Sequence, residues 1–242
     1  MTSFVAVALM LNDTSFSARS GNPKPMSGVT PVEMTSADIK VKIPSCEVTV
    51  TYSFKNTSGK SETAIMGFPE EGYDAYLDKK NKTWFKSFKS WVDGKSTPVL
   101  VQKIDDPSND PDFGYSVWWV KSIDFKAGQV RSVKNVYMSQ PGGDTMPRQF
   151  FEYIVHTAKS WRGPIGKIRL ELDASGLEKG TRYATKAKPH KVDGDQLAWF
   201  WTNLEPDETN DLWVAWERKE YNYESADMAK VLGGFVRVAS GK

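Results

Sequence analysis

The sequence lacks the residues that covalent cross-links and most metal sites require. A single cysteine, Cys46, among 242 residues excludes an intramolecular disulfide bond. Cys46 lies between Pro44 and a segment that alternates apolar and polar residues, so we expect it to be buried as a small hydrophobic residue. His156 and His190 have no neighbouring cysteine, and zinc or copper sites usually need three or more such ligands. We therefore expect both histidines to be structural or surface residues and expect no cofactor.

An excess of one charge is also missing. The chain has 32 basic and 30 acidic residues, which gives a formal net charge of +2. The two signs are well mixed, so no long-range field favours DNA, RNA or an anionic membrane. Nucleic acid is therefore not an expected partner.

Long apolar runs are limited to residues 4–11 (FVAVALML). This run is too short to span a bilayer and lacks the Lys or Arg that usually precedes the apolar core of a signal peptide. It is either the remnant of an export signal or a first β-strand. As a strand, it could add to the sheet edge of a neighbouring molecule and support self-association.

Alternating apolar and polar residues occur along most of the chain, with little helical periodicity. In the clearest case, Val48, Val50, Tyr52 and Phe54 fall on one face of a strand while the residues between them are polar. The pairs Asp93-Gly94 and Asp193-Gly194 predict two-residue hairpin turns. Only residues 225–232 indicate a helix, with Ser225 as the N-cap. We therefore predict an all-β protein with one short C-terminal helix.

The loop at residues 140–147 contains two prolines and two glycines, which resist regular structure. We place a domain boundary there, near residue 145. The predicted organisation is an apolar segment and lead-in loop at residues 1–27, a β-sandwich domain at residues 28–145, and a second β-rich domain with the short helix at residues 146–242. Two sandwiches of roughly 100 residues each fit this length.

The carboxylates Glu70, Glu71 and Asp74 lie beside Tyr73 and Tyr76 in a predicted loop. Glycoside hydrolysis needs two acids held across a cleft, so these residues are the candidates for a catalytic pair. Consecutive glutamates in an extended chain point in opposite directions, however, and acidic loop residues mostly serve solubility. Tyr73 and Tyr76 are also candidates for sugar binding.

A second acidic loop contains Asp105, Asp106, Asp110 and Asp112. These side chains offer the oxygen ligands that calcium prefers. The loop lacks the glycine and the bidentate glutamate of the helix-loop-helix calcium site, and its prolines fit an ordinary turn. A solvated loop is therefore favoured over a calcium site.

Tryptophans supply the other candidate ligand-binding residues. Trp118 and Trp119 are adjacent, so in a strand they point to opposite faces, and at least one leaves its own sheet's core. That ring is either a glycan platform or an interdomain contact, and the contact is favoured for two packed domains. Trp161 and Arg162 precede a Gly-Pro turn, where guanidinium–indole stacking would rigidify an interface or present a planar binding surface.

Several segments resemble bacterial secreted proteins of the domain-of-unknown-function 4424 type. The segments that carry the resemblance are Asn12-Asp13, Met34 with Asp38-Ile39, Phe54-Lys55-Asn56, Met66 to Pro69, Trp91 to Lys95, Phe125 to Gly128, Tyr153 to Thr157, Ser160 to Gly166, Trp199 to Pro206 and Trp213 to Trp216. The resemblance implies an exported, mostly β protein and supplies no catalytic residues. A full export signal would be expected at the N-terminus, where only residues 4–11 remain.

These observations favour a secreted, periplasmic or cell-surface module that binds a ligand or has a structural role without catalysing a reaction. A polysaccharide or a surface protein is the expected partner. The alternatives are a polysaccharide-active hydrolase that uses the loop carboxylates and a subunit of an extracellular assembly joined by strand addition.

Overall fold

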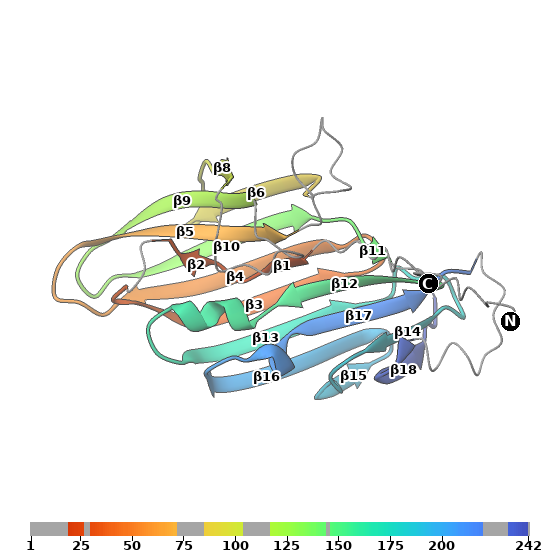
Figure 1. Ribbon diagram of the computed structural model, residues 1–242. Helices are drawn as coiled ribbons and strands as arrows, with labels where there is room; N and C mark the ends of the chain where they lie inside the picture. The colour runs from red at the N-terminus through yellow and green to blue at the C-terminus, as the bar shows by residue number, and fades with distance from the viewer. Residues whose placement is uncertain are drawn as a thin grey trace, which may run out of the picture.

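The computed structural model describes residues 19–26, 30–71, 85–103, 117–143, 146–219 and 232–241. Two large β-sheets pack on each other in this part of the chain and enclose the main core (Figure 1). The ten-stranded sheet has the order β18 (Phe235–Val238), β14 (Arg182–Thr185), β17 (Leu212–Glu217), β12 (Arg148–Ile154), β1 (Arg19–Gly21), β5 (Glu62–Glu71), β9 (Val117–Phe125) and β8 (Leu100–Lys103), with β11 (Gly142–Gly143) on β12 and β2 (Lys24–Pro25) on β5. The eight-stranded sheet has the order β15 (Lys191–Asp193), β16 (Gln196–Leu204), β13 (Ile165–Asp173), β3 (Val32–Lys42), β4 (Glu47–Asn56), β10 (Val130–Met138), β6 (Ser87–Val92) and β7 (Lys95–Ser96).

The all-β prediction is confirmed. The described residues outside the strands include two short 3₁₀ helices, η2 (His156–Ser160) and η3 (Glu208–Asn210). The predicted helix at residues 225–232 lies, except for its last residue, outside the described residues. In the described part of the chain, we find no helix with the length and apolarity needed to cross a membrane.

Strand β4 shows how period-two alternation forms the sandwich. Val48, Val50, Tyr52 and Phe54 are fully buried, while Thr51 between them is exposed. β4 pairs antiparallel with β3 on one side and β10 on the other. Sheets of this kind bury one face and leave the other in water, which is the pattern that the sequence predicts.

The Asp93-Gly94 hairpin turn between β6 and β7 is also confirmed. Asp93 and Gly94 have φ values of 50° and 77°, and a type I′ turn requires positive φ at both central residues. The Asp93 carboxylate accepts hydrogen bonds from Arg131 Nε at 2.8 Å and from the Ser132 backbone N–H at 2.9 Å. The turn is therefore tied to β10 as well as to its own strands.

The two predicted sandwiches share both sheets and do not form separate domains. In the eight-stranded sheet, β13 from the second half pairs parallel with β3 from the first half. In the ten-stranded sheet, β12 pairs parallel with β1. The main core is continuous from Val32 to Ala239. The expectation of two separate sandwiches is thus corrected, because the edge strands of each half hydrogen-bond to one another. The boundary predicted near residue 145 itself falls outside the described residues.

Candidate functional site

The end of β5 places Glu70 inside the sandwich. The sequence predicted this residue in a loop, but it is a strand residue with a relative exposure of 1%. Glu70 Oε1 accepts a hydrogen bond from the Phe85 backbone N–H at 2.8 Å, and Oε2 accepts one from Trp119 Nε1 at 2.5 Å. Burial raises the pKa of the Glu70 carboxyl to about 7, although the bonds from Trp119 and Phe85 oppose this shift.

The other candidate carboxylates do not join Glu70 in the described structure. Glu71 is the last residue of β5, so the expectation of a loop is corrected here too. Asp74, Tyr73 and Tyr76 lie outside the described residues. Asp105, Asp106, Asp110 and Asp112 also lie outside them. Within the described ranges, we find no group of three or more His, Cys, Asp or Glu residues that could hold a metal ion.

A buried lysine lies on the same inner face of β9 as Trp119. Lys121 has a relative exposure of 4%, and its Nζ donates hydrogen bonds to Ser90 Oγ and, at 2.9 Å, to Asn135 Oδ1. Burial lowers the pKa of the Lys121 amine to about 7. These contacts join β9 of one sheet to β6 and β10 of the other, so Lys121 is a polar link across the core.

The tryptophans that the sequence selected for ligand binding are mostly buried. Trp118 points away from the core face of β9, as the alternation predicted, yet it is only 3% exposed and Lys24 Nζ lies 5.4 Å from its ring. Trp119 packs against Phe88 with ring centroids 5.0 Å apart. Trp161 is also 3% exposed, and its Nε1 donates to the Pro23 carbonyl at 2.7 Å. These rings mainly stabilise the fold and offer little surface to a sugar.

Arg162 remains accessible at the edge of an open groove. The groove has a volume of about 510 Å³ and is lined by Thr30, Pro31, Ser160, Trp161 and Arg162. Arg162 donates to Thr57 Oγ1 at 2.9 Å and does not stack on Trp161 in any contact that we observe. The groove therefore offers one guanidinium and two hydroxyl-bearing residues, with little aromatic surface.

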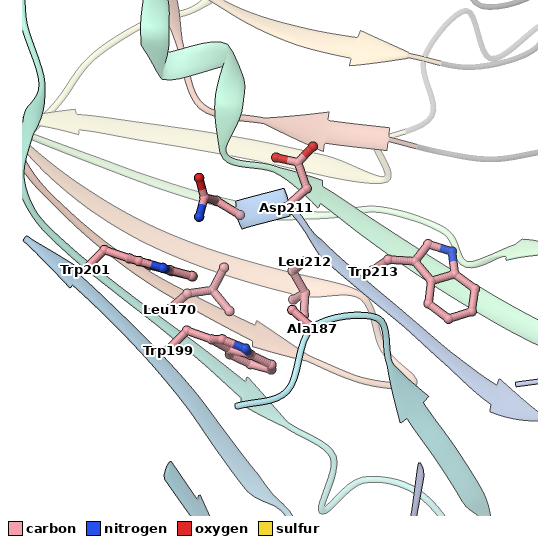
Figure 2. Close-up of a pocket in the computed structure, with 8 residues that line it drawn as sticks. Leu170, Ala187, Trp199, Trp201, Asp211, Leu212 and Trp213 are labelled. Atoms are coloured by element: carbon pink, nitrogen blue, oxygen red, sulfur yellow. The ribbon is translucent and has the colours of Figure 1, made fainter. Parts of the chain in front are cut away.

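A second, small cavity between the two sheets is lined by aromatic, aliphatic and polar side chains (Figure 2). Trp199 and Trp201 come from β16, and Leu212 and Trp213 come from β17. The cavity volume is about 10 Å³, which is room for one water molecule. This cavity is too small to bind an organic ligand.

Asp211 lines this cavity and also contacts His156. Asp211 Oδ2 lies 2.6 Å from His156 Nδ1, and Oδ1 accepts from the backbone N–H groups of Val155 and His156. The hydrogen bond to Asp211 raises the pKa of His156. The other histidine, His190, accepts a hydrogen bond at Nδ1 from the Phe200 backbone N–H at 2.9 Å.

The outer face of the eight-stranded sheet carries two aromatic residues, Phe200 and Trp91, that the sequence did not identify as binding candidates. Across six neighbouring strands, cross-strand pairing places one side chain of each strand in a single line. We call this line the central row; it consists of Phe200, Arg169, Asp38, Thr51, Lys134 and Trp91, in that order. Phe200 is 44% exposed and Trp91 is half-buried. With neighbouring strands ~4.8 Å apart, the two rings lie about 24 Å from each other along the row.

Each ring of the central row has a cation from the adjacent strand beside it. The Arg169 guanidinium lies 5.9 Å from the Phe200 ring centroid, and Lys134 Nζ lies 5.6 Å from the Trp91 ring. The row therefore reads aromatic, cation, polar, polar, cation, aromatic. The strand alternation could have identified Phe200, because Trp199 and Trp201 share the inner face and the residue between them must point outward.

Polar side chains dominate the rows on both sides of the central row. One flanking row consists of Thr202, Lys167, Ser36, Ser53 and Ser132, and the other consists of Ala198, Glu171, Lys40, Thr49, Val136 and Lys89. The hydroxyl, amine and carboxylate groups of this face project from hydrogen-bonded strands, of which β3 has a register shift between Met34 and Ser36. The face is thus a broad, rigid polar surface with an aromatic ring near each end.

Comparison with known proteins confirms the resemblance found in the sequence. A family model described as "Domain of unknown function (DUF4424)" matches residues 11–105. No curated protein matches the chain. Among solved structures, a protein from Legionella pneumophila described as a "putative nutrient binding protein" superposes with a TM-score of 0.67 and 17% sequence identity, covering 84% of this chain and 73% of that chain.

A protein of the aminopeptidase N family from Idiomarina loihiensis has a TM-score of 0.37 and 13% identity, covering 74% of this chain and 29% of that chain. This similarity is too low to support any argument about the present chain. The Legionella similarity establishes the shared fold alone. Over residues 11–105, the chain resembles the DUF4424 proteins.

Proposed function

We propose that this chain is an exported, non-catalytic binding module that holds a glycan on the outer face of its eight-stranded sheet. The observation that carries the proposal is the central row, in which exposed Phe200 and half-buried Trp91 bracket a line of polar side chains. Sugar rings have apolar faces and hydroxyl rims, and aromatic faces with adjacent polar groups match both.

A rigid sheet face suits this role because it holds the two rings at a fixed separation. Every strand that contributes to the central row has buried residues on its inner face, including Ile168, Ile39, Tyr52 and Asn135. Binding therefore orders few protein groups, which limits the entropic cost of association.

The described acids support binding rather than hydrolysis. Glu70 is 1% exposed, and both of its oxygens already accept hydrogen bonds from Trp119 and Phe85. A glycosidase acid must reach the scissile oxygen, and its partner carboxylate must face it across a cleft. Among the described residues Glu70 meets neither condition, which supports a structural role for it.

Two further features support a binding protein outside the cytoplasm. The resemblance to secreted proteins favours export to the periplasm or the cell surface. The Legionella protein of the same fold is described as a "putative nutrient binding protein", which agrees with a binding role for the present chain. Strand addition by residues 4–11, and hence a role as an assembly subunit, remains the second proposal, and these residues lie outside the described structure.

Affinity gel electrophoresis in soluble polysaccharides tests the proposal. We expect at least one polysaccharide to retard the wild-type protein, and the double variant Trp91→Ala/Phe200→Ala to migrate as in a gel without polysaccharide. Trp213→Ala is the matched control, because Trp213 is a half-buried tryptophan with the Arg148 guanidinium 5.4 Å from its ring, but on the other sheet. Retardation that persists in the double variant would contradict the proposal.

An assay of reducing ends separates binding from hydrolysis. We expect no release of reducing ends from a polysaccharide that retards the protein. Release that is lost in Glu70→Gln while retardation is retained would establish the hydrolase instead.

A further inference from the structure

We propose that the ligand of the outer face is a linear acidic polysaccharide, which lies across the strands along the central row. This inference rests on the proposed glycan-binding function and specifies its ligand class. It follows from the pairing of each ring of the central row with a cation: Phe200 with Arg169, and Trp91 with Lys134.

A sugar ring that carries a carboxylate presents an apolar face and an anionic edge. An aromatic ring with a cation beside it offers a surface to each of these two features at once. The same pairing occurs at both ends of the central row, and the two pairs are separated by Asp38 and Thr51. A polymer that repeats its carboxylates can engage both ends, whereas a single sugar can engage only one.

The charge of the outer face favours an anionic ligand. The central row and its two flanking rows contain the cations Lys167, Arg169, Lys134, Lys40 and Lys89 and the carboxylates Asp38 and Glu171. Glu171 is already shared between Arg169 and Lys40. The ion pairs of the described residues on this face thus leave Lys134, Lys89 and Lys167 available to carboxylates of a ligand.

The direction of the ligand follows from the positions of the rings. Phe200 and Trp91 lie on different strands in the same row, so a chain that contacts both must cross β13, β3, β4 and β10. Its carboxylates then pass Lys167 on one side and Lys89 on the other. A chain running parallel to the strands would meet only one ring.

A matched pair of polymers tests the charge. Polygalacturonate and its fully methyl-esterified form share one backbone and differ in carboxylate charge. We expect polygalacturonate, alginate or hyaluronate to bind in affinity gels. For an acidic polymer that binds, we expect Lys134→Gln/Lys167→Gln to weaken binding about tenfold, as loss of two exposed ion pairs would do. For polygalacturonate we expect methyl esterification to cause a loss of similar size. The charge-matched control is Lys60→Gln/Lys126→Gln, at two exposed lysines in loops at the strand ends.

The outcomes separate this inference from the proposed function. One outcome would overturn the acidic ligand and leave glycan binding intact: neutral and acidic polymers bind equally strongly, the binding needs Trp91 and Phe200, and Lys134→Gln/Lys167→Gln does not affect it. Failure of every polysaccharide, neutral or acidic, would overturn both. If single-stranded poly(dT) bound through the same residues as strongly as the acidic polysaccharide does, the face would bind polyanions in general. That result would overturn the inference that its ligand is a polysaccharide. Thermal unfolding is measured for each variant. A midpoint like that of the wild type shows that the variant is folded, so that its loss of binding comes from the substituted side chains.

Discussion

Tyr52 and Tyr153 bring their hydroxyl oxygens to 2.8 Å from each other between the two sheets, and Asn22 Oδ1 accepts from both hydroxyls. Tyr52 belongs to β4 of the eight-stranded sheet and Tyr153 to β12 of the ten-stranded sheet. Burial raises the pKa of both phenols well above the ordinary value, so they remain neutral hydrogen-bond donors. This cluster joins both layers and both halves of the chain.

Replacement of Asn22 by alanine should destabilise the protein. The change leaves the buried Tyr52 and Tyr153 hydroxyls and the Val155 carbonyl without their amide partner. We expect the free energy of unfolding, measured by urea denaturation, to fall by about 3 kcal/mol. Thr63→Ala removes an exposed hydrogen bond to Asp124 and should cost less than about 1 kcal/mol. Equal losses in the two variants would show that the buried cluster has no special importance.

Glu70 should make the protein less stable as the pH rises. Its folded pKa of about 7 lies above the ordinary value of 4.5, so the fold favours the protonated carboxyl. The resulting stabilisation is fully present below pH 4.5 and is lost as the pH rises through 7. We expect a loss of the order of 3 kcal/mol over this window, measured as wild type relative to Glu70→Gln, which cannot ionise. A constant difference between the two proteins across the window would refute a raised pKa at Glu70.

Lys121 should have the opposite dependence in a more alkaline window. Its folded pKa of about 7 lies below the ordinary value of 10.5, so the fold favours the neutral amine. Its stabilisation is complete above pH 10.5 and is lost as the pH falls toward 7. We expect the stability of the wild type relative to Lys121→Met to increase by several kcal/mol between these limits. The same urea denaturation series measures this difference, and a difference that stays the same from pH 7 to pH 10.5 would rule out a lowered pKa at Lys121.

Local patterns predicted the strands well because they depend on neighbouring residues alone. The alternation around Tyr52 and the positive φ required at Gly94 are both visible within a few residues. The parallel pairing of β13 with β3 joins residues more than a hundred positions apart, and no local pattern encodes it. That pairing merges the two predicted sandwiches into one.

The candidate site was predicted less well because sequence shows which residues alternate, but not what covers the outer face. The alternation predicted that Trp118 or Trp119 points outward; Trp118 does, yet it is buried, with Lys24 Nζ beside its ring. Glu70 was expected in a solvated loop because it follows Pro69 and precedes Glu71, but β5 continues through both glutamates. Trp91 and Phe200 become a pair only through cross-strand register, which the structure supplies.

Gly94 provides the last test, which isolates backbone conformation from packing. A Cβ added at Gly94 would meet no atom within 4 Å, so the cost of Gly94→Ala comes from its φ of 77° alone. We expect alanine there to lower the free energy of unfolding by about 1 to 2 kcal/mol, because an L-residue in the left-handed region is strained.

Gly59→Ala is the matched control, since its added Cβ also meets no atom and its φ is not positive. We expect that control to change stability by less than about 0.5 kcal/mol or to stabilise the protein slightly. If both variants lost the same stability in urea, the turn between β6 and β7 would not depend on positive φ at Gly94, and the type I′ geometry beside Trp91 would need another explanation.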